Sequence, residues 1–177
     1  MLNLSNPGVK LSVSILAIAF VYFKATKISK YSLSGDLLLV TPKIQSLLFW
    51  VFIYLIYMLG SDWLFNWRGV WNFQTWKDQS LFISLERVLA VGIFGPIAEE
   101  LIFRGILLTK LNRLKINKWV CLFIVTALWT VIHVNYSFWI LILIFFNGLL
   151  LGLSRYYSGS LIIPIILHII WNLYSVW

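Results

Sequence analysis

The chain has 177 residues, of which 61% are hydrophobic and only 11% are charged, with a net charge of +8. A soluble domain averages about 25% charged residues, so a single soluble core cannot bury this much apolar surface. We therefore expect an integral membrane protein of the all-α class. The positive charge does not indicate a nucleic-acid partner, because the basic residues stand in short clusters between apolar runs.

Six hydrophobic segments predict a polytopic bundle of about six transmembrane helices, forming one domain over residues 1–177. A helix needs about 20 residues to cross the hydrocarbon core. The first segment is followed by three lysines and has no cleavage-site pattern, which favours a retained helix over a removed signal peptide. The segments are residues 8–24, 44–64, 80–109, 118–135, 137–154 and 160–177.

Two stretches depart from plain spans. The third segment is longer than the others and contains Gly95-Pro96, where the missing proline N–H predicts a kink. Residues 66–78 are aromatic and polar, which predicts an interfacial segment with tryptophans at headgroup level. The single cysteine, Cys121, excludes an intrachain disulfide and any multi-cysteine metal site, and we interpret it as an apolar filler.

The basic residues predict how the bundle is oriented. If the first helix begins outside, most of the Lys and Arg residues fall in inner loops, as the positive-inside rule requires. We therefore expect both termini outside. The inner set is Lys24, Lys27, Lys30, Lys43, Lys110, Arg113, Lys115, Lys118 and Arg155, and the outer set is Lys10, Arg68 and Lys77.

Two acids inside the third segment require an explanation, because charged groups at bilayer depth cost about 2.5–3.5 kcal/mol each on insertion scales. Glu100 and Arg104 are spaced i,i+4 with the acid first, which favours an ion pair on one helix face. Glu99 is rotated about 100° away around the helix and can face another partner. A purely structural ion network of the three residues remains an open alternative.

The two histidines of the chain fall at a similar expected depth. At about 1.5 Å per residue from the nearest inner basic residue, Glu99 is about 16 Å deep, His133 about 22 Å and His168 about 20 Å. Asn172 follows His168 at i+4 and projects from the same helix face. The four side chains could meet in one layer of the membrane, although a single membrane histidine often only bonds a neighbouring helix.

This set of side chains favours hydrolysis by water. A carboxylate in a low-dielectric site is a competent base, and beside an imidazole it can deprotonate a water molecule. A second imidazole and an amide can donate to the oxyanion that forms on a carbonyl. No G-x-S-x-G elbow is present, so direct attack by water on a peptide bond fits better than an acyl-enzyme. We expect no cofactor, although Glu and two His can ligate zinc and that alternative stays open.

Three motifs over about residues 88–175 resemble a known family. EELIFR at 99–104 matches EExxxR, HIIWN at 168–172 matches HxxxN, and His133 occupies the histidine of an FxxxH-like motif. Together they resemble the CPBP family of intramembrane proteases, which comprises the type II CAAX prenyl endopeptidases, the Abi proteins and bacteriocin self-immunity proteins. The predicted helices at 8–24 and 44–64 carry no motif.

The resemblance implies a role for each matching residue. Glu99 would be the catalytic base of a glutamic endopeptidase and would activate water together with His133. His168 and Asn172 would stabilise the oxyanion.

Three more positions complete the implied site. Glu100 and Arg104 would support it structurally. Trp129 replaces the Phe of the family pattern and would form a larger cavity wall that carries an N–H.

The resemblance also bears on the biological setting. The larger prenyl-protease members have about two more helices, so a membrane-associated peptide or protein is favoured over a prenylated substrate. Such a substrate would be a bacteriocin, a pheromone or the tail of a membrane protein, cleaved in a bacterial or archaeal cell membrane for self-immunity or peptide maturation.

Two alternatives to a protease remain. A non-catalytic immunity or scaffold protein on the same fold would act by binding alone, without needing an intact set of catalytic positions. A small transporter or proton relay would predict inverted repeats, and the sequence contains none.

Overall fold

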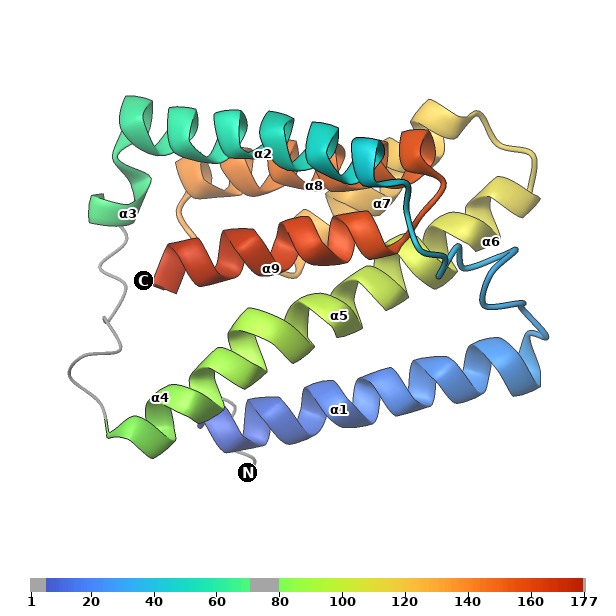
Figure 1. Ribbon diagram of the computed structural model, residues 1–177, viewed down its shortest axis with the longest axis horizontal. Coiled ribbons are helices and arrows are strands. Elements are labelled where there is room, and N and C mark those ends of the chain that lie inside the picture. Colours follow the sequence, from blue (N-terminus) through green and yellow to red (C-terminus); the bar gives the residue numbers. More distant parts are fainter. Residues whose placement is uncertain (1–5, 71–79, 177) are drawn as a thin grey trace.

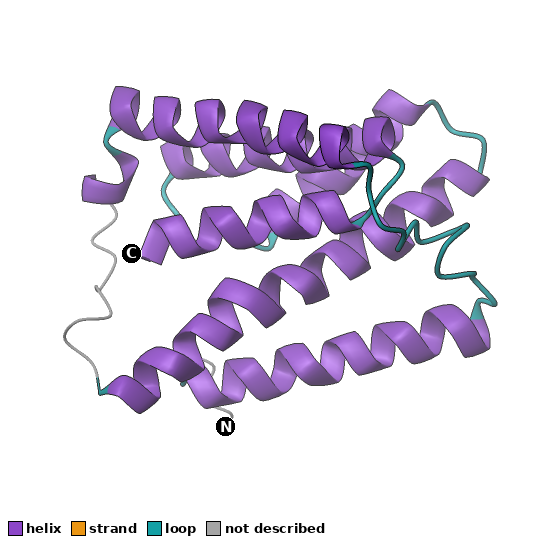
Figure 2. Cartoon of the chain, viewed as in Figure 1, coloured by secondary structure: helices purple, strands orange, loops and turns teal. Residues whose placement is uncertain are grey.

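The computed structural model describes residues 6–70 and 80–176, and every regular element within those ranges is a helix (Figure 2). The hydrophobic segments each form one helix, which confirms the predicted all-α membrane bundle. The elements are α1 (Pro7–Phe23) with η1 (Lys24–Ile28), α2 (Ile44–Phe65), α3 (Trp67–Val70), one long helix made of α4 (Leu81–Arg87), η3 (Val88–Phe94), α5 (Gly95–Glu100), η4 (Leu101–Leu107) and α6 (Leu108–Arg113), and then α7 (Lys118–Val131), α8 (Phe138–Ser158) and α9 (Ile162–Val176).

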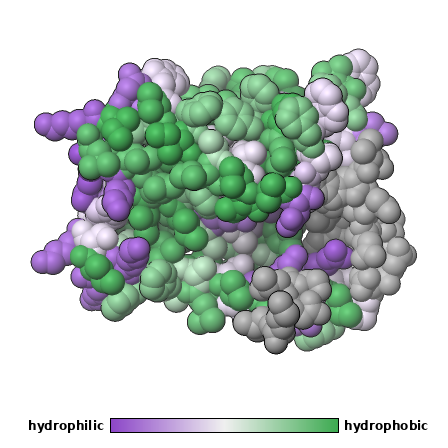
Figure 3. All heavy atoms as spheres, turned by 180° about the vertical axis from the view of Figure 1, so that it is seen from behind, coloured by the Kyte–Doolittle hydropathy of each residue, from purple (hydrophilic) through white to green (hydrophobic). Residues whose placement is uncertain are grey.

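Four of these helices are long and apolar enough to cross a membrane, and they comprise residues 7–28, 44–65, 81–113 and 138–158. Helices α7 and α9 are equally apolar but shorter, at 14 and 15 residues. Hydrophobic side chains cover the middle of the face seen in Figure 3. Large side chains such as Phe20, Phe52 and Phe146 are more than half exposed, as expected where the solvent is lipid.

Short polar residues set the helix starts. The Asn6 side chain accepts hydrogen bonds from the first N–H groups of α1, Ser80 accepts from Ile83 N–H at the start of α4, and Asn117 accepts from Trp119 N–H at the start of α7. These caps satisfy backbone donors that have no partner inside the helix. Helix α8 ends at Ser158 and is capped by Gly159, whose φ of +67° is the left-handed conformation that glycine adopts without a steric penalty.

Two helix boundaries differ from the prediction. Helix α7 ends at Val131, and residues 132–135 form a turn, so His133 follows the helix instead of lying on it. Helix α8 continues to Ser158, so Arg155 is a buried residue of that helix and not a loop cation. Apolar periodicity locates a helix core well but its ends less well, because capping and turn geometry decide the last residues.

The long helix contains two π-helical turns, η3 and η4, on either side of α5. At the predicted kink, the Gly95 N–H donates to the Ala90 carbonyl five residues earlier, and Pro96 occupies the first turn of α5. Each π turn inserts a residue into the normal helical repeat and so changes which side chains face the bundle. Glu99 and Glu100 lie between the two insertions. Of the predicted interfacial stretch 66–78, residues 71–78 lie outside the described ranges.

The long helix runs diagonally between α9 and α1 (Figure 1). Helix α1 packs against the long helix, while α2, α8 and α9 pack together on its other side. Both ends of the described chain lie at one end of the bundle, and the connections that hold most of the lysines lie at the other. The largest core cluster fills the space among α2, α3, α7, α8 and α9, with Trp50, Tyr54, Met58, Trp67, Trp129, Ile140, Ile144, Leu151, Ile163, Leu167 and Trp171.

Candidate active site

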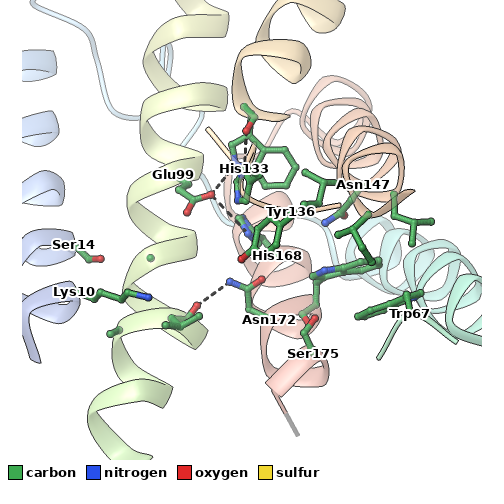
Figure 4. A pocket seen from close by; sticks show the side chains of 18 of the residues that line it. Lys10, Ser14, Trp67, Glu99, His133, Tyr136, Asn147, His168, Asn172 and Ser175 are labelled. Carbon is green, nitrogen blue, oxygen red and sulfur yellow. Dashed lines mark hydrogen bonds and ion pairs between the residues drawn. The ribbon is translucent and has the colours of Figure 1, made fainter. Parts of the chain in front are cut away.

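A cavity of about 410 Å³ lies between α1, the long helix, α8 and α9. Glu99, His133, His168 and Asn172 all line it, although they are spread over 74 residues of sequence (Figure 4). The rest of the wall is mainly apolar and aromatic, as is usual for a pocket that binds an organic ligand. The tertiary structure therefore brings the four predicted residues together.

Glu99 presents its carboxylate to this cavity, with 30% of the side chain exposed. Its Oε2 accepts a hydrogen bond of 2.7 Å from the Trp129 indole N–H. The same oxygen lies 4.0 Å from Nε2 of His168. The acid is thus held by one neutral donor and faces one imidazole, while Oε1 has no hydrogen bond among the described residues.

His133 is oriented by the backbone of the last turn of α7. Its Nδ1 lies 2.8 Å from the Trp129 carbonyl oxygen. A carbonyl oxygen only accepts, so Nδ1 must carry the hydrogen, and in the neutral ring Nε2 is left with a lone pair. The imidazole also stacks on Tyr136, with ring centroids 5.9 Å apart. His133 therefore adds a basic nitrogen to the cavity.

Tyr136 lies on the connection between α7 and α8, next to the site. Burial raises the pKa of its hydroxyl, and the negative charge of Glu99 raises it further. Its hydroxyl therefore stays protonated at neutral pH.

His168 is held by the second acid of the motif. Its Nδ1 lies 2.9 Å from Oε1 of Glu100, and the same oxygen accepts a hydrogen bond of 2.9 Å from Arg104. All three side chains are at most 4% exposed. Because the carboxylate accepts, His168 carries a hydrogen on Nδ1 and turns Nε2 towards Glu99. Glu100 therefore bonds both Arg104 and His168, a residue expected to stabilise the oxyanion. The i,i+4 spacing indicated only the pairing with Arg104.

The remaining donors of this network reach the backbone of neighbouring helices. Arg104 donates through Nη2 to the Gly148 carbonyl of α8, at 3.0 Å. Asn172 donates through Nδ2 to the Val91 carbonyl in η3, at 2.8 Å. A primary amide has two N–H groups, so Asn172 keeps one donor besides the one that ties α9 to the π turn.

Trp129 not only forms part of the cavity wall but also contacts other residues of the site. Its indole N–H reaches Glu99, its carbonyl orients His133, and the Arg104 guanidinium lies 4.6 Å from its ring centroid. The ring is 2% exposed. A cation above the face of an indole is attracted by the electron-rich ring.

Close approach of α7 and α8 holds this tryptophan in place. A Cβ at Gly148 would come within 2.9 Å of both Thr126 and Trp129. Small residues allow such contact between membrane helices, because they let the backbones come close.

Sequence reasoning missed several polar residues in this region, among them Asn147 and Lys10. Asn147 on α8 lines the cavity and is 1% exposed, and its Oδ1 accepts a hydrogen bond of 2.6 Å from Tyr54. An amide within the apolar run FFNGLLLG was a detectable signal, because polar residues inside membrane helices usually face the bundle interior. Lys10 on α1, which the distribution of basic residues places among the outer cations, also lines the cavity.

No group of three or more His, Cys, Asp or Glu side chains within residues 6–70 and 80–176 is arranged to hold a metal ion. Both imidazoles use Nδ1 for a hydrogen bond, His133 to a backbone carbonyl and His168 to Glu100.

Comparison with known proteins gives a family match over residues 80–174, to the model described as type II CAAX prenyl endopeptidase Rce1-like. The chain is also 31% identical over 93 residues to a protein of Escherichia coli described as an uncharacterized 24.3 kDa protein. That alignment covers 51% of this chain and 43% of the relative, so the chain matches less than half of the relative's length. No solved structure matches the chain.

Proposed function

Because the chain belongs to the type II CAAX prenyl endopeptidase Rce1-like family of intramembrane proteases, we propose that it is a glutamic endopeptidase that hydrolyses a peptide bond of a membrane-associated substrate. The observation that carries this proposal is the position of Glu99. Its carboxylate opens into a cavity within the bundle, is held by the Trp129 N–H, and lies 4.0 Å from an imidazole nitrogen of His168.

Glu99 is the general base in this proposal, and His133 helps it to position a water molecule. A base must reach the proton that it removes, and Oε1 of Glu99 is available to accept one from water in the cavity. Nε2 of His133 can accept the second water proton as a hydrogen bond, since Nδ1 of that ring is already committed to a carbonyl. The water then attacks the carbonyl carbon of the scissile peptide bond without a covalent intermediate on the enzyme. When the tetrahedral intermediate collapses, the C–N bond breaks and the proton held by Glu99 passes to the leaving nitrogen.

His168 and Asn172 act on the other side of the reacting carbonyl. When Nε2 of His168 carries a hydrogen, it can donate to the developing oxyanion. Asn172 contributes its remaining N–H. Both groups are positioned in advance by hydrogen bonds to Glu100 and to Val91, so little reorganisation is required when charge develops.

The substrate class follows from the walls of the cavity. Trp67, Ile140, Ile144 and Trp171 are among the lining residues, and they suit apolar side chains of a membrane-associated peptide or protein. We place the enzyme in a bacterial cell membrane with both termini outside, where its product would serve bacteriocin self-immunity or peptide maturation. The basic connections at the opposite end of the bundle support this orientation.

The decisive experiment compares membrane-associated peptides from cells that carry the wild type or the Glu99→Gln variant. The amide keeps the volume of the side chain but cannot accept a proton from water, so cleavage should be lost while the protein still accumulates in the membrane. Glu86→Gln is the matched control, because that acid lies on the same helix but does not line the cavity. If both Glu99→Gln and His133→Ala keep the full protective activity in cells, a non-catalytic immunity or scaffold protein is favoured instead.

The proposed mechanism uses no metal ion. Activity of the purified protein should therefore survive exhaustive chelation. Loss of activity on chelation, with recovery on addition of zinc, would overturn this part of the proposal and leave the assignment as a protease intact.

A further inference from the structure

Arg155 is a buried cation that the proposed reaction does not use. It lies near the end of α8, opposite the ends of the described chain, and is 3% exposed. Burying a guanidinium is costly unless a negative group compensates its charge. Within residues 6–70 and 80–176, no carboxylate forms an ion pair with Arg155.

The hydrogen bonds of Arg155 reach only neutral acceptors. Nη2 donates to the Thr109 hydroxyl at 2.7 Å and to the Asp36 backbone carbonyl at 3.2 Å. Nε is buried and has no partner. The Asp36 carboxylate is engaged elsewhere, since it pairs with Arg113 and accepts from the Ser32 N–H and hydroxyl. The guanidinium is therefore bonded on one side to neutral acceptors and has no ion-pair partner among the described residues.

A second cavity, of about 310 Å³, lies beside this guanidinium at the lysine-rich end of the bundle. Asn112 adds an amide to it, and because its Oδ1 accepts a hydrogen bond from Tyr156, the N–H₂ group remains available as a donor. The lining residues are Gly35, Asp36, Leu38, Thr109, Asn112, Arg113, Arg155 and Tyr156.

We infer that this cavity is an anion site in which Arg155 and Asn112 bind a phosphate group, supplied by the headgroup of an anionic phospholipid. Phosphate oxygens are strong acceptors that match the several donors of a guanidinium, and they would compensate the charge that the protein leaves unpaired. The location favours a lipid, because the cavity lies at the end of the membrane helices, where headgroups meet basic residues. Asp36 repels an anion, but its pairing with Arg113 offsets its charge, so the approach lies on the side of Arg155 and Asn112.

The test measures thermal unfolding of the purified protein in a neutral detergent, followed by the fluorescence of its 10 tryptophans. Dioctanoyl-phosphatidylglycerol should raise Tm in a saturable way, because a ligand of the folded state stabilises it by mass action. Dioctanoylglycerol, which has the same chains and no phosphate, should not. Inorganic phosphate is titrated in parallel, and an equal rise at the same concentrations would overturn the lipid as the source of the phosphate.

Variants connect the effect to the cavity. Arg155→Gln should raise the half-saturating lipid concentration by about tenfold or more, because a charge-assisted hydrogen bond is lost. Asn112→Ala retains the buried cation and should also weaken the response, and it decides the question if Arg155→Gln does not fold. Lys110→Gln, an exposed cation on the same helix as Asn112, removes the same charge outside the cavity.

A loss of response in Lys110→Gln equal to that in the cavity variants would show nonspecific attraction and overturn the site. An unchanged response in both Arg155→Gln and Asn112→Ala would do the same. The readout is stability and not cleavage, so the result is independent of the proposed protease activity.

Discussion

The Trp129 indole N–H donates a hydrogen bond of 2.7 Å to Oε2 of Glu99 and so joins the end of α7 to the long helix. On the other side of the same residue, the Trp129 carbonyl orients His133. Trp129 is therefore a positioning residue for the proposed base and its partner. A phenylalanine, which the family pattern has at this position, could provide the ring and the carbonyl but not the N–H.

Trp129→Phe tests the contribution of that N–H. The aromatic ring beside Arg104 is retained, while Glu99 loses its only donor of an N–H hydrogen bond among the described residues. A hydrogen bond to a charged group contributes about 1.5–3 kcal/mol, so kcat should fall about tenfold or more with KM little changed. The measurement is steady-state cleavage of a fluorogenic peptide in detergent micelles.

The control for this substitution is Trp119→Phe, on the same helix but half exposed and remote from the cavity. It should leave kcat unchanged. Wild-type kcat in Trp129→Phe would mean that the hydrogen bond does not position Glu99 for the reaction.

The buried pair of Glu100 and Arg104 should be required for folding. Both side chains are 0% exposed and joined at 2.9 Å, so Glu100→Ala or Arg104→Ala leaves a buried charge without its partner. Breaking such a pair costs about 3–5 kcal/mol, and we expect a low membrane yield and a lower Tm for each variant. Normal yield and Tm in either one would contradict the structural role. Glu99→Gln, which leaves the pair intact, should accumulate normally.

Gly148 and Gly60 form a matched pair of glycines in helix interiors. A methyl group at Gly148 would be 2.9 Å from Trp129 and Thr126, whereas one at Gly60 would meet nothing within 4 Å. Gly148→Ala should therefore destabilise the protein by about 1–3 kcal/mol through overpacking and should also lower activity by displacing Trp129. Gly60→Ala should be neutral or stabilising by about 0.5–1 kcal/mol. Thermal unfolding of both variants measures this difference, and equal Tm values would contradict it.

Asp36 should make stability depend on pH at the lysine-rich end. The hydrogen bond from the Ser32 N–H and the bond to Arg113 lower the pKa of this carboxyl below its usual value of 3.8. The stabilisation is present above that usual value and is lost as pH falls through the lower pKa of the folded state. Asp36→Asn should thus lower stability at pH 6 by about 0.2–1 kcal/mol, the range for exposed pairs, and the difference from wild type should shrink near pH 3. A difference that does not change between these pH values would exclude this role for the charge.

Some features of the site were evident from the sequence because they depend on neighbours along one helix. The i,i+4 spacing of Glu100 and Arg104 predicted their pairing, and the rotation of about 100° predicted a different direction for Glu99. The apolar composition predicted membrane helices, and three motifs predicted the family, which the match over residues 80–174 confirms.

The sequence by itself determined the helices, the membrane environment and the chemical types of the candidate site residues, since apolar length and local spacing decide these. Only the tertiary structure decided which of them meet across helices. His168 pairs with Glu100, Trp129 reaches Glu99, and Arg155 is buried. Such contacts depend on how packed helices are rotated and how far apart they lie. The two π turns of the long helix change the rotation, and the close approach at Gly148 changes the separation. Neither can be read from the sequence when a regular helical repeat is assumed.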